Sequence, residues 1–137
     1  MFEWKDQYSV GIEKLDQQHK KLLGIGRKLI DILENTSEGI DQFDHIRDTL
    51  KEMYDYSIYH FKYEEGLMEK YDFIDLASHR FQHKIFIKKI EEFDIEEVDE
   101  QQKKTTLELL DFISNWIIDH ILKTDQKYSI LLIEKGE

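Results

Sequence analysis

Cysteine and proline are both absent from the 137 residues of the chain. Without cysteine the protein cannot form disulfides, iron–sulfur clusters or thiolate nucleophiles, so histidine and carboxylate side chains must hold any metal. Because proline kinks or breaks helices, its absence leaves long helices uninterrupted by this residue. No apolar run approaches the roughly 20 residues that are needed to span a bilayer. These absences favour an all-helical protein whose metal chemistry, if any, uses histidine and acidic residues.

The charge of the chain is strongly one-sided. Thirty acidic residues against nineteen basic ones give a formal net charge of −11. Such a surface repels phosphate backbones and anionic lipid headgroups, so we expect neither nucleic acid nor a membrane as a partner. Residues 1–6 lack the basic and apolar regions of a secretion signal. We therefore expect a cytoplasmic monomer with a single domain over residues 1–137.

Four segments carry apolar residues at the three- and four-residue spacing of an amphipathic helix. We expect helices over residues 16–34, 41–70, 75–93 and 100–122, with Asp16 and Asp75 as capping residues and an acidic connection before the fourth helix. Short connections between long helices favour antiparallel neighbours. The sequence therefore predicts an all-α fold, an antiparallel up-down-up-down four-helix bundle.

Polar residues interrupt the apolar stripes of these four helices. They are five histidines and one glutamate: His19, His60, Glu64, His79, His83 and His120. A lone histidine on such a stripe is usually a satisfied core residue, but burial of an unpaired carboxylate is costly and no lysine or arginine shares the stripes. In each of the pairs His60/Glu64 and His79/His83 the residues are four apart and share one helical face. With alternating helix directions all six residues fall at one end of the bundle, which indicates a metal site.

The sequence resembles the hemerythrin family, specifically its single-domain bacterial members, over essentially its whole length. The matching segments are residues 8–12 (YSVGI), 15–19 (LDQQH), 60–64 (HFKYE), 79–83 (HRFQH) and 116–121 (WIIDHI), the last leading to Asp125. The spacing alone fits two divalent transition metals, including zinc, manganese or cobalt, whereas the resemblance implies iron.

The resemblance also assigns the ligands. It implies that His79, His83 and His120 bind one iron. His19 and His60 would bind the other, with one position left open. Glu64 and Asp125 would bridge the two irons together with an oxo or hydroxo group.

Asp125 does not fit a regular fourth helix. It follows His120 by five residues, about 140° further round an ideal helix, so the two side chains would not face the same site. The fourth helix must therefore end, tighten or bulge between these two residues.

The function implied by the resemblance is reversible binding of dioxygen, for storage, delivery or scavenging, without catalytic residues and with no identified protein recipient. Leu22, Trp116 and Ile121 are candidate walls of a dry O2 pocket, and Lys123 lies where some relatives carry an apolar residue. One alternative is an oxidase, peroxidase or nitric-oxide-reducing enzyme, although di-iron bundles that activate O2 are richer in carboxylates. Others are a sensor acting on a partner protein and a metal-free helical protein.

Overall fold

A computed structural model describes residues 1–34, 43–93 and 102–136 of the chain. The long helices are α1 (Glu13–Glu34), α2 (Phe43–Lys70), α3 (Leu76–Glu91) and α4 (Gln102–Asp119). Three shorter elements complete the described structure: the 3₁₀ turn η1 (Asp6–Tyr8), the π-helix η3 (His120–Asp125) and α5 (Gln126–Glu134). No strand occurs in these three ranges.

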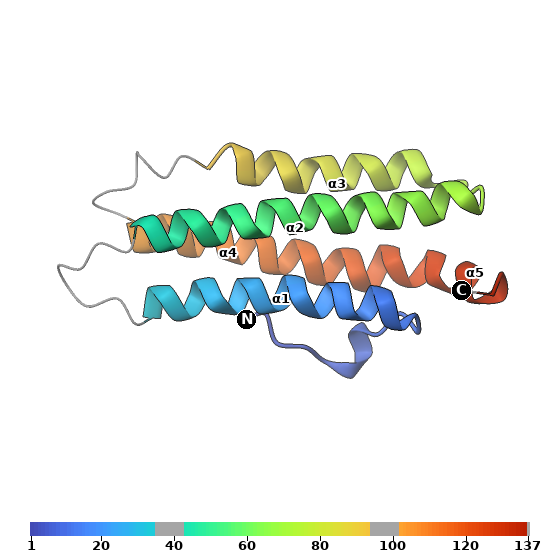
Figure 1. Ribbon diagram of the computed structural model, residues 1–137, viewed down its shortest axis with the longest axis horizontal. Coiled ribbons are helices and arrows are strands. Elements are labelled where there is room, and N and C mark those ends of the chain that lie inside the picture. The colour runs from blue at the N-terminus through green and yellow to red at the C-terminus, as the bar shows by residue number, and fades with distance from the viewer. Residues whose placement is uncertain (35–42, 94–101, 137) are drawn as a thin grey trace.

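The four long helices lie side by side, each running opposite to the one before it (Figure 1). α1 packs against α2 and α4, and α3 packs against the same two helices. The architecture is an antiparallel up-down-up-down four-helix bundle, as predicted. The starts of α1 and α3 and the ends of α2 and α4 lie at the same end of the bundle (Figure 1).

The bundle is held together by the apolar stripes of the helices. Leu29 of α1, Met53 of α2, Phe86 of α3 and Ile113 of α4 are all at most 1% exposed and belong to one continuous core. Removal of this apolar surface from water supplies the main driving force for folding. Across the described part of the chain, we find no helix long and apolar enough to cross a membrane.

The helix boundaries differ from the predicted ones in particular places. Asp16 is not an N-cap: α1 begins three residues earlier, and the Asp16 backbone N–H donates to the Ile12 carbonyl, 3.0 Å away. The Asp16 carboxylate instead accepts hydrogen bonds from the Val10 N–H (2.8 Å) and the Ser9 hydroxyl (2.5 Å). This acid therefore holds the incoming chain against the first turn of α1.

The third predicted helix is close to the observed one. Asp75 does precede α3, but its side chain makes no capping hydrogen bond, and α3 ends at Glu91, two residues short of the predicted Phe93. The acidic connection after it and the first two residues predicted for the second helix lie outside the described residues.

The C-terminal part of the chain is more helical than predicted. The fourth helix was expected to end at residue 122, whereas the π-helix and α5 carry the helical path on to Glu134. α5 buries Tyr128 and Leu132, which are four residues apart on one face. It therefore closes the same end of the bundle at which the candidate metal ligands gather.

Candidate metal centre

Four elements bring seven polar side chains together at one end of the bundle. α1 supplies His19, α2 supplies His60 and Glu64, α3 supplies His79 and His83, and the π-helix supplies His120 and Asp125. All seven side chains are at most 6% exposed. Polar groups are rarely buried so completely without a hydrogen-bond partner, an ion-pair partner or a metal ion. The neighbours of these seven side chains therefore indicate their role.

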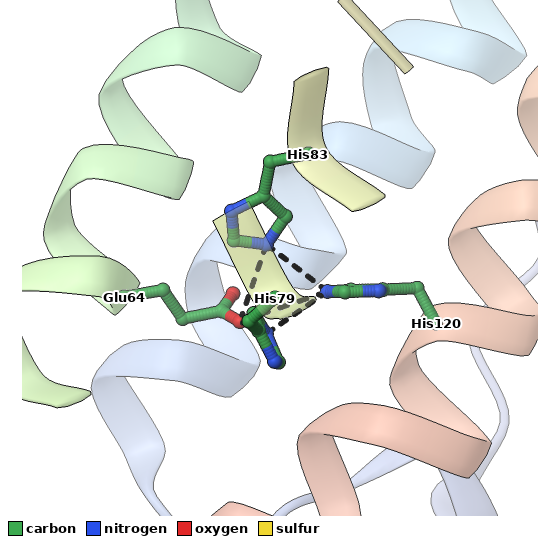
Figure 2. A group of neighbouring side chains, drawn as sticks. All are labelled: Glu64, His79, His83 and His120. Carbon is green, nitrogen blue, oxygen red and sulfur yellow. Dashed lines mark hydrogen bonds and ion pairs between the residues drawn. The ribbon is translucent and has the colours of Figure 1, made fainter. Parts of the chain in front are cut away.

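The first group of donors consists of one carboxylate and three imidazoles (Figure 2). His79 Nε2 lies 2.9 Å from Glu64 Oε1 and 3.1 Å from His120 Nε2. His83 Nε2 also lies 3.1 Å from His120 Nε2. The three rings come from two different elements, α3 and the π-helix, and all aim Nε2 at one point.

The second group contains His19, His60, Glu64 and Asp125. His60 Nε2 lies 2.6 Å from Glu64 Oε2, and His19 Nε2 lies 3.2 Å from Asp125 Oδ2. In each of the two groups, the possible ligand atoms all lie within 4.8 Å of one another. Two neighbouring points therefore each have several nitrogen and oxygen donors around them.

Both carboxylates face both groups. Glu64 turns Oε1 toward His79 and Oε2 toward His60. Asp125 turns Oδ1 toward His79 (3.1 Å) and Oδ2 toward His19 (3.2 Å). One oxygen of each acid is thus directed to each group, which is the arrangement of a carboxylate that spans two cations.

The π-helix explains how Asp125 reaches the site. Residues His120–Asp125 form a π-helix in the middle of an otherwise α-helical path. In a π-helix the hydrogen bonds run from i to i+5, so residues five apart lie one above the other. His120 Nε2 is consequently 3.1 Å from Asp125 Oδ1. The expected distortion between these two residues is confirmed, in the form of a bulge.

The opposite ring nitrogens of three histidines have hydrogen-bond acceptors that sequence reasoning missed. His60 Nδ1 donates to Gln18 Oε1 (2.6 Å), and His120 Nδ1 donates to Gln82 Oε1 (2.9 Å). His83 Nδ1 donates to the third acceptor, a Glu65 carboxylate oxygen (2.8 Å). Such bonds fix the tautomer and the ring orientation, and they leave the Nε2 lone pair free for a metal.

Comparison with known proteins agrees with this geometry. A sequence profile described as the hemerythrin HHE cation binding domain matches residues 10–131. The chain belongs to the hemerythrin family.

The matches to single relatives extend over nearly the whole chain. It is 40% identical to a bacteriohemerythrin of Clostridium acetobutylicum over 128 residues, 93% of this chain and 98% of that protein. A hemerythrin-like protein of Naegleria gruberi is 30% identical, covering 96% of this chain and 93% of that one. A crystal structure of wild-type hemerythrin superposes with a TM-score of 0.75 at 25% identity, covering 95% of this chain and 96% of the other.

The hemerythrin site has polar atoms that the protein itself does not satisfy. His19 Nε2, Glu64 Oε2 and Asp125 Oδ2 have no aligned hydrogen-bond partner among the described residues, although other donors or acceptors lie close by. A cation that accepts lone pairs from both nitrogen and oxygen satisfies all three atoms at once. The donor set therefore fits the metal ions that this family binds.

The electrostatics of the hemerythrin site also favour a cation. Burial opposes ionisation of Glu64 and Asp125, but the surrounding histidines outweigh it and hold the pKa of both carboxyls below the ordinary range. Burial likewise opposes protonation of His19 and His120, yet the two carboxylates raise the pKa of His19 to about 9 and that of His120 to about 10. The two buried carboxylates thus stabilise positive charge at this site, whether protonated histidines or metal cations carry it.

His83 differs from His19 and His120. Burial is the main cause that lowers its pKa to about 4, and the neighbouring His120 and His79 add to the effect. Its ring stacks on Phe61, with centroids 4.0 Å apart and planes within 6° of parallel. Burial therefore favours the neutral form of the His83 ring, the form that a metal requires.

The three candidate wall residues of the oxygen pocket lie in different surroundings. Leu22 and Ile121 are at most 2% exposed and belong to the core. Trp116 is half-buried and stacks on His120, with ring centroids 4.5 Å apart. Their role as walls remains a prediction. His45, which was expected to be a surface residue, is exposed on α2.

Tyr128 is an additional neighbour of the site that sequence analysis did not identify. Its side chain is fully buried, and its ring meets the His79 ring edge-on with centroids 5.3 Å apart. Burial, followed by the nearby Glu64 and Asp125 carboxylates, raises its pKa well above the ordinary value. Only its position on α5, a helix that the sequence pattern did not predict, brings it here.

Proposed function

We propose that this hemerythrin holds two iron ions between its helices and binds dioxygen reversibly at one of them. His79, His83 and His120 bind the first ion, and His19 and His60 bind the second. Glu64 and Asp125 bridge the two, with an oxo or hydroxo group as the third bridge. Residues 1–137 act as one domain, and the protein serves in oxygen storage, delivery or scavenging.

The observation that carries this proposal is the unequal number of imidazoles around the two points. Each carboxylate offers one oxygen to each group, so the carboxylates contribute equally. The first group adds three histidines, whereas the second adds only His19 and His60. The second metal is left one protein donor short, and a site that keeps an open position can accept an exogenous ligand.

Two ferrous ions together supply the two electrons that reversible binding of dioxygen requires. The chain contributes the surroundings. His60 and His120 are held by Gln18 and Gln82, so the rings need not reorient when a ligand arrives or leaves. Leu22, Trp116 and Ile121 would form apolar walls that exclude water from the open position. Exclusion of water from the pocket opposes the proton transfers that would make oxygen binding irreversible.

The experiment that tests this proposal is anaerobic loading of the protein with Fe(II), followed by oxygen titration with optical detection. We expect about two irons per chain, as in other di-iron bundles. We also expect a visible absorption band that appears when air is admitted and disappears under argon over repeated cycles.

Two outcomes would contradict parts of this proposal. An iron-loaded protein whose spectrum does not respond to oxygen would exclude the carrier function while leaving the metal site intact. A spectrum that changes once and cannot be reversed would instead favour an enzyme or a sensor. The His45→Ala variant serves as a control, because this exposed histidine lies outside the donor groups.

A further inference from the structure

A surface groove runs between α2 and α3 beside the metal centre. It has a volume of about 510 Å³. Its apolar lining comes from Ile58 and Phe61 of α2 and Ile87 of α3, and its basic lining from Lys62, Arg80, Lys84 and Lys88. We call it the α2–α3 groove. Its size falls within the roughly 300–1,000 Å³ of small-molecule sites, and its lining combines apolar side chains with a few charges, as such sites do.

The charges of the groove are opposite in sign to those of the molecule as a whole. Four basic residues line it against two carboxylates, Glu65 and Glu91, although the whole chain carries −11. Glu65 pairs with Arg80 (3.0 Å), and Glu91 accepts a hydrogen bond from the Tyr54 hydroxyl (2.7 Å). The groove is thus a local exception on an acidic protein, and it attracts small anions.

Two of the basic residues are available to a ligand. Lys62 and Lys84 are exposed on facing helices, and neither makes an ion pair within the described parts of the chain. Lys88, by contrast, lies 3.8 Å from Glu92. An anionic group between Lys62 and Lys84 would gain charge-assisted hydrogen bonds without breaking an existing pair.

The lining of the groove includes three apolar side chains. Phe61 is 4% exposed, and its ring stacks on His83 on one side and meets Phe86 edge-on, 5.5 Å between centroids, on another. Ile58 and Ile87 are half-buried beside it. Aromatic rings pack favourably against such a mixture of aliphatic and aromatic side chains.

From these observations we propose that the α2–α3 groove binds a small organic anion with a planar aromatic body. The anionic group lies between Lys62 and Lys84, and the aromatic body covers Ile58, Phe61 and Ile87. The lysines select charge and the apolar residues select the ring, so both parts of the ligand are needed. This site goes beyond the proposed oxygen binding and does not depend on it.

The position of the groove connects its ligand to the metal centre. Glu65 lines the groove, pairs with Arg80 through Oε1, and accepts the His83 hydrogen bond through Oε2 at 2.8 Å. Phe61 lines the groove and stacks on the same histidine. His83 also lines the groove, so a ligand there lies beside this candidate metal ligand and the two side chains that hold it in place.

Isothermal titration calorimetry of the metal-loaded protein with oxidised flavin mononucleotide tests the proposal, because this probe joins a planar aromatic ring system to a phosphate. We expect one probe molecule per chain. Lys62→Glu and Lys84→Glu should each weaken binding by about fivefold or more, as reversal of a contacting charge predicts. Lys127→Glu makes the same charge change on the exposed surface of α5, outside the groove, and should leave the affinity within about twofold.

Riboflavin and inorganic phosphate separate the two contributions. Riboflavin keeps the ring without the charge, and phosphate keeps the charge without the ring, so each should bind more weakly than flavin mononucleotide. Three results would overturn the proposal: no binding at millimolar probe, equal loss in the three lysine variants, or phosphate binding as tight as that of the flavin. None of these measurements involves oxygen, so they succeed or fail independently of the oxygen-binding test.

Discussion

Residues next to the candidate ligands in sequence support ligands on other elements. Gln18 precedes His19 on α1 but accepts from His60 on α2. Glu65 follows Glu64 on α2 but accepts from His83 on α3. The same relation joins Gln82 on α3 to His120 on the π-helix. Each hydrogen bond therefore couples neighbouring elements and orients a ring.

This arrangement explains which residues of the site could be predicted from the sequence. The ligand pairs His60/Glu64 and His79/His83 are local, because the i, i+4 spacing places both members on one helical face. The hydrogen-bond acceptors of the His60 and His83 Nδ1 atoms are not local, because they lie on other helices. Which acceptor meets which ring depends on how far one helix is displaced along its neighbour, and no periodicity within a single helix contains that information.

Glu65 accepts the hydrogen bond of the His83 Nδ1–H. Glu65→Ala removes the acceptor of the His83 Nδ1–H and should lower metal affinity by about 10- to 100-fold, because supporting partners of this kind orient the ligand and raise its basicity. Glu65→Gln keeps an oxygen acceptor without the charge, so its effect should be smaller. Competition with a chromophoric chelator measures both affinities.

Glu69→Ala is the matched control for Glu65. Glu69 also pairs with Arg80, at 3.4 Å, but it makes no contact with His83 among those the structure shows. We expect its metal affinity to remain that of the wild type. If Glu69→Ala weakened metal binding as much as Glu65→Ala does, the loss would come from Arg80 and the surface, and the positioning role of Glu65 would be refuted.

At the scale of elements, regular periodicity predicted the helices well and failed where the path is irregular. The core stripes of α1 to α4 repeat every three or four residues, and these helices were found within a few residues of their bounds. α5 was missed because the π-helix shifts its stripe out of register with that of α4. The π-helix therefore brings Asp125 to the site, and it is also the reason that the apolar pattern did not predict α5.

Phe2 provides a second attachment of the N-terminal arm, residues 1–12, to α1. Phe2 is fully buried, although its φ of 65° lies in the left-handed region that non-glycine residues rarely adopt. Its backbone carbonyl accepts a hydrogen bond from Arg27 Nη1, 3.2 Å away. Its ring lies over Gly26, where a Cβ would come within 2.4 Å of the ring. The Phe2 ring can lie this close to α1 because Gly26 has no side chain.

Gly26→Ala should therefore destabilise the protein, despite the higher helix propensity of alanine. The new methyl group must displace Phe2, and such overpacking costs about 1–3 kcal/mol. Gly66→Ala is the control, because a Cβ at Gly66 in α2 meets nothing within 4 Å. It should stabilise the protein by about 0.5–1 kcal/mol. Urea unfolding of the metal-loaded variants measures both free energies of unfolding. If Gly26→Ala stabilised the protein, the packing of Phe2 would not depend on the missing side chain of Gly26.

For the whole molecule, the bundle divides into an apolar end and a polar end. The described core around Leu29, Met53 and Ile113 is apolar, whereas the other end buries two carboxylates and five histidines. Buried charges contribute to stability only when their partners compensate for the lost hydration. The metal ions of the proposed centre would compensate these buried charges, so we expect metal binding and folding to be thermodynamically linked.

Metal binding should therefore raise the stability of the folded protein. Adding metal at about one hundred times its dissociation constant should stabilise the wild-type protein by about 2.7 kcal/mol, which raises the melting temperature by roughly 10 °C for a chain of this size. His79→Ala removes a buried donor at the centre of the first group, so it should bind less metal and gain much less from its addition. His45→Ala changes an exposed histidine and should gain as much as the wild type. Calorimetric scans with and without metal measure the shifts, and a full metal-dependent shift in His79→Ala would show that this residue is not a ligand.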